Sequence, residues 1–292
     1  MIQTVNAKIN IGLNVVGRRA DGYHELSTVF YPIGLFSGIP YSPWPFSDII
    51  EITPIPEEKD HRFLFTGNPI DCPLHKNLVW KAVDAFEKRY YEKMGCEMPA
   101  MNIHLEKHIP DGAGLGGGSA DASFTLLMLD RLTGGHLGQE ELFHLSATLG
   151  ADCPFFIYNR PCLAEGIGDR ITPLSIDLTG YWLVILKPPF AISTKEAFSG
   201  IVCRSDNSEK VFSESVLEWR DVLVNDFETH LFEKYPVLLH LKKDLYDGGA
   251  DYAQMSGSGS AVYGIFSSID QAGKVWEKWR ATEGYYSAIM RL

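Results

Sequence analysis

Several features that define common protein classes are missing from this chain of 292 residues. Lys and Arg number 26 against 37 Asp and Glu, a net charge of -11, so the chain lacks the basic surface that nucleic acids and anionic membranes require. It also lacks a stretch of about 18 uninterrupted apolar residues and a basic N-terminal start followed by an apolar run. We therefore expect a soluble, untargeted protein with no nucleic-acid partner and no membrane partner.

Cysteine patterns of the kind that build disulfide frameworks or zinc clusters are also missing. The chain has five cysteines, an odd number, and they form no C-x-x-C pair. This usage fits a reducing compartment, and we expect a cytoplasmic protein.

The length and the hydrophobic content of 45% allow one large domain or two ordinary ones. Strand and helix patterns alternate along the chain, and near residue 160 the pattern changes to short extended pieces separated by glycines. The simplest fold class is α/β, of the α+β type, with two domains at residues 1–159 and 160–292. The acidic stretch 204–215 is expected to be a surface loop.

Local patterns predict several elements. Apolar and polar residues alternate from Val5 to Val15, which indicates a strand whose second face carries Lys8 and three asparagines; taken alone, this face is expected to be solvated. Asp21-Gly22 marks a hairpin turn. A helix is predicted from Asn77, its N-cap, to Met94, with Gly95 just past its end. The aromatic and proline-rich segment 36–47 is expected to be an irregular loop without an assignable role.

The stretch PDGAGLGGGSADAS at residues 110–123 is the most informative segment, partly because of what it lacks. No lysine follows its glycines as a P-loop requires. Gly112, Gly114 and Gly117 satisfy the dinucleotide pattern G-x-G-x-x-G, but Pro110-Asp111 intervene after the strand and the candidate acid, Asp130, ends a helix. Neither standard phosphate-binding template therefore applies.

The segment nevertheless has the features of an anion-binding site. Five glycines from Gly112 to Gly118 lead from a strand into a helix, and the N–H groups at a helix N-terminus favour an anion. Ser119 is expected to cap this helix and to add a hydroxyl to a phosphate or its metal. Because no P-loop lysine is present, further positive charge must come from Lys8 or from a metal ion.

A carboxylate is expected near any hydroxyl that attacks phosphorus. Asp152 follows the helix-ending Gly150 and precedes the apolar run 155–158, which implies partial burial. On local sequence alone, a capping or turn role for Asp152 is equally acceptable. Asp251, in the similar Gly-Ala-Asp segment at 249–251, is a rival in a more polar setting.

Four segments, in the same order, resemble the signature segments of the GHMP kinases (galactose, homoserine, mevalonate, phosphomevalonate). These segments are AKINIGLNVVGRRADGYHEL, PDGAGLGGGSADAS, GADCPFF and MSGSGSAVYGIF. The resemblance implies a two-domain fold with the active site in the cleft between the domains, ATP as co-substrate and Mg²⁺ as the accompanying ion. The N-terminal domain would bind ATP, and the C-terminal domain would contribute to the substrate site.

The resemblance also implies roles for individual residues. Lys8 and Asp152 match the catalytic pair, Asn10 matches a residue that places the substrate, and Ser119 is a candidate metal ligand. The ATP phosphate loop would comprise Pro110, Asp111, Gly112, Ala113, Gly114, Leu115, Gly116, Gly117, Gly118, Ser119 and Ala120. The loop at 256–260 would support a diphosphate or shape the cleft.

The segment DGYHEL is similar to that of family members whose small-molecule substrate carries a cytidine diphosphate moiety. There the phosphoryl group goes to the 2-hydroxyl of a methylerythritol unit. Tyr23 would stack on the base and His24 would bond its polar edge, while Thr194 and Phe198 would form the opposite wall. Taken alone, Tyr23 and Phe198 would be assigned to the core.

Overall fold

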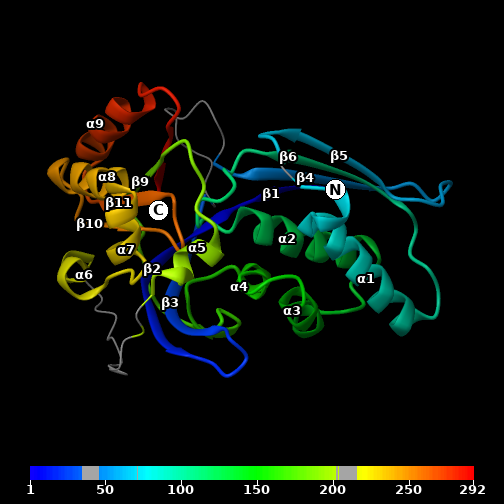
Figure 1. Cartoon of the computed structure of the whole chain (residues 1–292). Coiled ribbons are helices and arrows are strands. Elements are labelled where there is room, and N and C mark those ends of the chain that lie inside the picture. Colours follow the sequence, from blue (N-terminus) through cyan, green and yellow to red (C-terminus); the bar gives the residue numbers. More distant parts are fainter. Residues whose placement is uncertain (35–45, 71, 202, 204–215) are drawn as a thin grey trace. The chain divides into compact units, whose positions relative to one another are not determined.

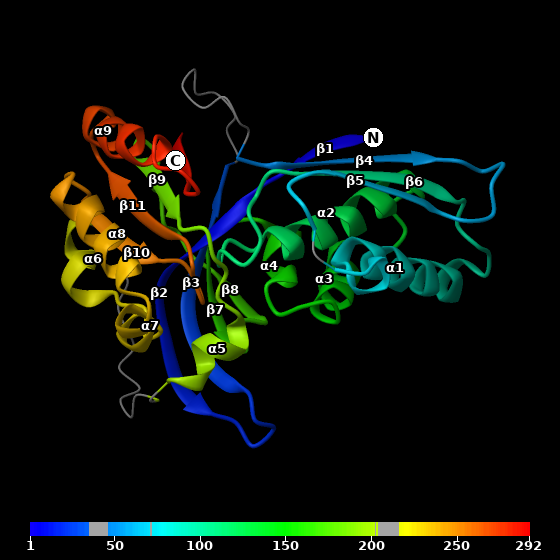
Figure 2. The same cartoon turned by 45° about the horizontal axis from the view of Figure 1, so that its top comes forward.

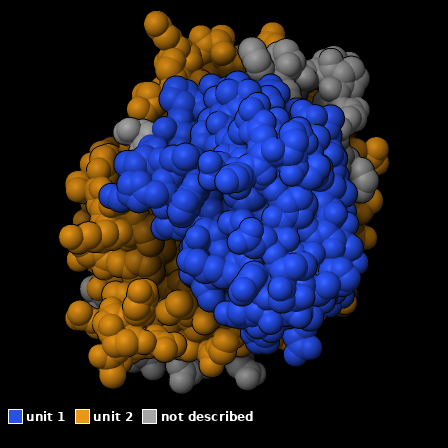
Figure 3. All heavy atoms as spheres, turned by 90° about the vertical axis from the view of Figure 1, so that its right-hand side faces the viewer, with its two compact units in different colours: residues 1–7, 45–110, 116–160 blue, residues 8–44, 111–115, 161–292 orange. Residues whose placement is uncertain are grey.

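The computed structural model describes residues 1–34, 46–70, 72–201, 203 and 216–292. The acidic stretch 204–215 and most of the segment 36–47 lie outside the described residues. The chain forms two compact units that are not contiguous in sequence. Unit 1 comprises residues 1–7, 45–110 and 116–160, and unit 2 comprises residues 8–44, 111–115 and 161–292 (Figure 3). These units differ from a simple division at residue 160, because the β-hairpin and half of the glycine loop pack with the C-terminal residues.

Unit 1 is a mixed four-stranded sheet with helices on one face (Figures 1 and 2). In spatial order its strands are β1 (Ile2–Val5), β4 (Asp48–Pro54), β6 (Met101–Lys107) and β5 (Arg62–Gly67). β5 runs parallel to β6, and the other neighbours are antiparallel. The helices are the 3-10 turn η1 (Leu74–Lys76), α1 (Leu78–Met94), α2 (Gly117–Leu132), α3 (Gln139–Ala147) and α4 (Cys153–Tyr158).

Both ends of α1 are fixed by the residues that the sequence indicates. The Asn77 side chain accepts a hydrogen bond from the Val79 N–H at 2.8 Å, and Gly95 ends the helix in the left-handed region at φ 70°. Val79, Val83 and Phe86 are buried on one face of the helix. The predicted helix is thus confirmed.

Unit 2 contains two four-stranded antiparallel sheets. The first has the order β2 (Ala7–Arg18), β3 (His24–Ile33), β7 (Cys162–Gly166) and β8 (Arg170–Pro173). The second has the order β10 (Tyr252–Met255), β11 (Val262–Phe266), β9 (Trp182–Lys187) and β12 (Tyr286–Arg291). The predicted hairpin at Asp21-Gly22 is confirmed as the β2–β3 connection.

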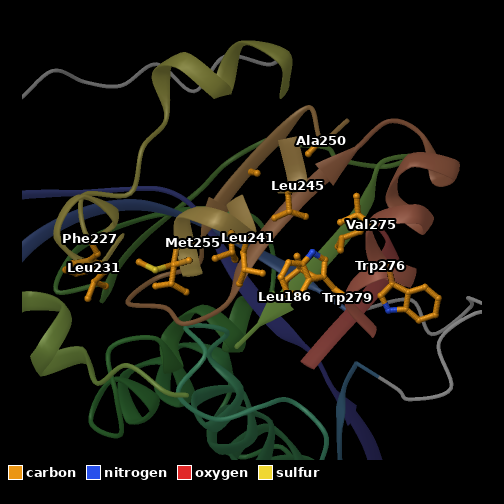
Figure 4. Close-up of a cluster of buried hydrophobic side chains, with 14 of the residues drawn as sticks. Leu186, Phe227, Leu231, Leu241, Leu245, Ala250, Met255, Val275, Trp276 and Trp279 are labelled. Atoms are coloured by element: carbon orange, nitrogen blue, oxygen red, sulfur yellow. The ribbon is translucent and has the colours of Figure 1, made fainter. Parts of the chain in front are cut away.

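The helices of unit 2 are α5 (Thr194–Ser199), α6 (Val216–Val222), α7 (Glu228–Lys234), α8 (Pro236–Asp247) and α9 (Ile269–Arg280). Figure 4 shows the cluster in which side chains of α8 and α9, such as Leu241, Leu245 and Trp276, gather with Leu186 of β9. This apolar cluster holds the second sheet, whose β10–β11 turn carries the Gly/Ser loop 256–260. Among the described helices, none is long and apolar enough to cross a membrane.

Replacing Gly95, the C-cap of α1, tests the cost of left-handed backbone at a position where a Cβ causes no steric clash. A Cβ at Gly95 would meet no atom within 4 Å, so Gly95→Ala should cost about 1 kcal/mol of unfolding free energy through its left-handed φ alone. Gly273→Ala, inside α9 and equally free of neighbours, should instead stabilise by about 0.5 to 1 kcal/mol. Urea midpoints of the two variants should therefore shift in opposite directions, and a shift in the same direction would contradict this account.

Candidate active site

The polar face of β2 is buried, so the expectation that it is solvated is wrong. Lys8 and Asn10 are only 3% and 2% exposed. The Lys8 Nζ donates to Asn10 Oδ1 at 2.6 Å and to the Gly114 carbonyl oxygen at 3.1 Å, and it lies 4.9 Å from the centre of the Phe30 ring. A buried ammonium needs such partners, because losing water without them is costly. The Asn10 amide in turn donates to Thr28 Oγ1 at 3.0 Å.

The first half of the glycine loop packs against the Gly/Ser loop 256–260 within unit 2. The Gly112 and Ala113 oxygens accept from the Ser260 and Ala261 N–H groups, each at 3.2 Å. Ser256 Oγ donates to the Gly114 oxygen at 2.8 Å and accepts from the Asn10 N–H at 3.2 Å. Ser256 thus joins the surroundings of Lys8, a contact that sequence reasoning missed although the MSGSGS motif contains it.

Helix α2 begins at Gly117, and its N-cap is Gly116, which has no side chain to accept a hydrogen bond. Ser119 is the third helical residue, so the expectation that it caps the helix is wrong. The first intrahelical bond runs from the Ala120 N–H to the Gly116 oxygen. The N–H groups of Gly117, Gly118 and Ser119 precede that bond and point out of the helix end, which makes the turn suitable for an anion.

Asp152 lies close to this helix end within unit 1. It precedes α4 at the N-cap position and is half-buried, as its sequence context predicts, but its side chain makes no capping bond. The next residue, Cys153, contacts Ser119, and the Cys153 oxygen accepts from Ser123 Oγ at 2.8 Å. Burial raises the pKa of the Cys153 thiol to about 12, so the thiol is a neutral neighbour. The first turns of α2 and α4 therefore bring Ser119 and Asp152 into one region.

A cavity of about 310 Å³ opens in unit 1 beside the start of α1. Its lining combines apolar side chains with two amides: Phe65, Thr66, Gly67, Asn68, Pro69, Ile70, Cys72, Leu74 and Asn77. Leu78, at the start of α1, lies 3.7 Å from the position of a Cβ on Gly118. The pocket therefore neighbours the first turn of α2. No sequence motif marks this pocket, because its residues come from a strand end and a connecting segment.

The residues expected at a base-binding wall come together in part. The His24 ring stacks on Phe198 of α5, with centroids 4.7 Å apart and planes 14° from parallel, and Phe227 supports Phe198 edge-on at 4.9 Å. Burial lowers the pKa of His24, which favours the neutral imidazole. Tyr23 is 61% exposed, so the expectation of a core residue is wrong for it, and Thr194 is also exposed.

The described residues contain no group of three or more His, Cys, Asp or Glu side chains arranged for a metal ion. The polar residues singled out above form two groups. Gly114, Lys8 and the 256–260 loop form one group in unit 2, and the α2 helix end with Ser119 and Asp152 forms another in unit 1.

Family models match both parts of the chain. Residues 77–160 match the GHMP kinases N terminal domain, and residues 211–284 match the GHMP kinases C terminal model. A crystal structure of 4-(cytidine 5'-diphospho)-2C-methyl-D-erythritol kinase is similar over 100% of both chains, with 30% identity and a TM-score of 0.78. The Methanococcus jannaschii mevalonate kinase, at 13% identity and a TM-score of 0.70 over 100% of this chain and 98% of its own, shares the fold. The chain therefore belongs to the GHMP kinases, and the expected fold class is confirmed.

Relatives with similar sequences indicate which group of GHMP kinases the chain belongs to. The chain is 45% identical to the 4-diphosphocytidyl-2-C-methyl-D-erythritol kinase of Parabacteroides distasonis, over 91% of this chain and 92% of the relative. It is 40% identical to that of Cytophaga hutchinsonii, over 92% and 93%. Within the GHMP kinases, the chain is thus a member of the family of 4-diphosphocytidyl-2-C-methyl-D-erythritol kinases.

The contact of Gly114 with the 256–260 loop leads to a stability prediction. A Cβ on Gly114 would lie 1.9 Å from the Ser256 oxygen, at φ 73°, so Gly114→Ala should cost about 2 to 5 kcal/mol. Gly118→Ala is the matched control, since its Cβ would have an ordinary contact at 3.7 Å. Urea unfolding should separate the two, and equal midpoints would contradict the role given to the close contact.

Proposed function

We propose that the protein transfers the γ-phosphoryl group of ATP to the 2-hydroxyl of 4-diphosphocytidyl-2-C-methyl-D-erythritol. The products are the 2-phosphate and ADP, in the methylerythritol phosphate route to isoprenoids. The observation that carries this proposal is the identity of 40% to 45% with relatives of that name over more than nine-tenths of the chain. The five cysteines form no disulfide within the described residues, which fits the reducing cytoplasm that we propose for the reaction.

ATP is proposed to lie along residues 110–120, with its phosphates at the N-terminal turn of α2. The cavity beside Asn77 suits the adenine ring, because apolar walls such as Ile70 and Pro69 accept a flat base while the Asn68 and Asn77 amides offer polar partners. Its closeness to Gly118 supports one nucleotide reaching both places. Mg²⁺ would share the charge of the β and γ phosphates, with the Ser119 hydroxyl as a proposed neutral ligand.

Lys8 and Asp152 are the proposed catalytic residues. The buried ammonium of Lys8, fixed by Asn10 and Gly114, would stabilise the negative charge of the transferring phosphoryl group and of the attacking oxygen. Asp152 would orient the acceptor hydroxyl and take its proton, while the phosphoryl group moves to that oxygen and ADP leaves. Asn10 would help to place the acceptor.

The cytidine end is proposed to bind at Tyr23, His24, Thr194 and Phe198. A neutral imidazole offers one donor and one acceptor, so His24 can match the polar edge of cytosine, whereas stacking on an aromatic ring suits any base. The stacked pair of His24 and Phe198 supports this location, because it already presents an aromatic surface. The Gly/Ser loop 256–260 would lie near the diphosphate.

The substrate assignment is tested by ATP consumption with a panel of acceptors. The cytidine-containing acceptor should be turned over, while free methylerythritol phosphate, mevalonate, homoserine and galactose should give little product. Turnover of only one of the last three would make the protein a GHMP kinase of another specificity. Nucleotide binding without turnover of any acceptor would indicate a catalytically silent regulator.

The role of Asp152 is tested by Asp152→Asn, which keeps the shape of the side chain but removes its charge and basicity. This variant should bind ATP normally and lose about 2 to 4 orders of magnitude in kcat. Asp251→Asn is the matched control, since Asp251 lies in the similar Gly-Ala-Asp segment and its Oδ2 accepts from the Ser267 N–H. Near-normal kcat in Asp152→Asn would rule out the proposed role.

A further inference from the structure

A buried group of charged side chains lies in unit 1, next to the first turn of α2. Lys107, the last residue of β6, donates from its Nζ to Asp48 Oδ2 at 2.5 Å and to Asp121 Oδ2 at 2.8 Å. All three side chains are at most 3% exposed. We call these residues the Lys107 cluster. Its residues come from β6, from the start of β4 and from the second turn of α2.

The Lys107 cluster also holds the backbone that leads toward the glycine loop. Asp48 Oδ1 accepts from the His108 N–H at 2.6 Å and from the Ile109 N–H at 2.9 Å. One carboxylate thus bonds the lysine with one oxygen and the following chain with the other. The exit of β6 is therefore fixed in direction by charge-assisted hydrogen bonds.

The same backbone contacts the wall of the cavity. The Lys107 oxygen accepts from the Asn68 N–H at 2.8 Å, and the His108 oxygen accepts from the Asn68 side-chain amide at 2.8 Å. On the other side, a Cβ on Gly117 would lie 3.2 Å from Lys107 Nζ and 2.9 Å from Ile109 Cγ2. The Lys107 cluster therefore contacts both the pocket and the first turn of α2.

We propose that Lys107, Asp48 and Asp121 are positioning residues that fix the cavity beside Asn68 relative to the N-terminal turn of α2. This inference rests on the proposed nucleotide site. The three residues would hold the cavity for the base and the α2 turn for the phosphates at the separation that ATP requires. None of the three touches the nucleotide through its side chain in this account. They act through the backbone of residues 107–109 and through α2.

Burial and the neighbouring charges shift the pKa values of two residues in the Lys107 cluster. Burial raises the pKa of Asp121 well above its ordinary value, and the neighbouring Asp48 acts in the same direction although Lys107 opposes it. Burial lowers the pKa of Lys107, but the two carboxyl groups outweigh this effect and raise it. Lys107 thus bonds both carboxyl groups, and Asp121 Oδ1 has no hydrogen-bond partner within the described part of the chain.

The test compares Asp121→Ala with Asp121→Asn in the full chain, using the dissociation constant of a non-hydrolysable ATP analogue and the KM of each substrate. Asp121→Ala removes the contact with Lys107 and should weaken nucleotide binding by about tenfold or more, with a matching rise in KM for ATP. The KM of the acceptor should change by less than about threefold. Asp121→Asn, whose amide oxygen can still accept from Lys107 Nζ, should retain nucleotide affinity within about threefold.

Lys88→Met is the matched control, because Lys88 forms an exposed pair with Asp84 and should leave nucleotide binding unchanged. Wild-type affinity in Asp121→Ala, or equal changes in both KM values, would overturn the proposal. So would an Asp121→Asn variant that loses nucleotide affinity, and this arm decides the matter even where Asp121→Ala does not fold. Turnover of the acceptor panel by the wild-type chain tests the proposed function separately.

Discussion

The carbonyl oxygen of Gly114 accepts hydrogen bonds from Lys8 Nζ and from Ser256 Oγ, and the candidate site in unit 2 depends on this convergence. The three residues come from β2, the glycine loop and the β10–β11 turn. Only a glycine lets the backbone come this close to the Ser256 oxygen. The same contacts fix the buried ammonium of Lys8. The glycine loop, which we propose as the phosphate site, thus also supports a cation that its own sequence lacks.

Two lysines of this acidic protein are buried and are held by hydrogen bonds. Lys107 is bonded to two carboxyl groups, so its charge is balanced inside the Lys107 cluster and its contribution is structural. Lys8 donates to the oxygens of Asn10 and Gly114, which orient its ammonium group. The net charge of the chain, -11, says little about either environment.

Local sequence patterns predict a structural feature correctly where the contacts that determine it lie within a few residues of the chain. The cap at Asn77, the end at Gly95 and the turn at Asp21-Gly22 are of this kind. The burial of Lys8 could not be predicted from β2, because its partner Gly114 is 106 residues away. The Lys107 cluster was missed for the same reason, since Asp48 lies 59 residues from Lys107. The cap of α2 was misassigned to Ser119 because glycine, with no side-chain signal, occupies the true N-cap at 116.

The run of glycines at 112–118 has no single physical cause, which explains why it fits several templates by spacing alone. Gly114 is required by its close contact with Ser256 inside unit 2. Gly117 belongs to unit 1, where a Cβ would lie 2.9 Å from Ile109 Cγ2, so that a neighbouring atom would have to shift. Gly118 has ordinary space, so packing alone does not require glycine there, and close approach by the proposed phosphate group would account for it.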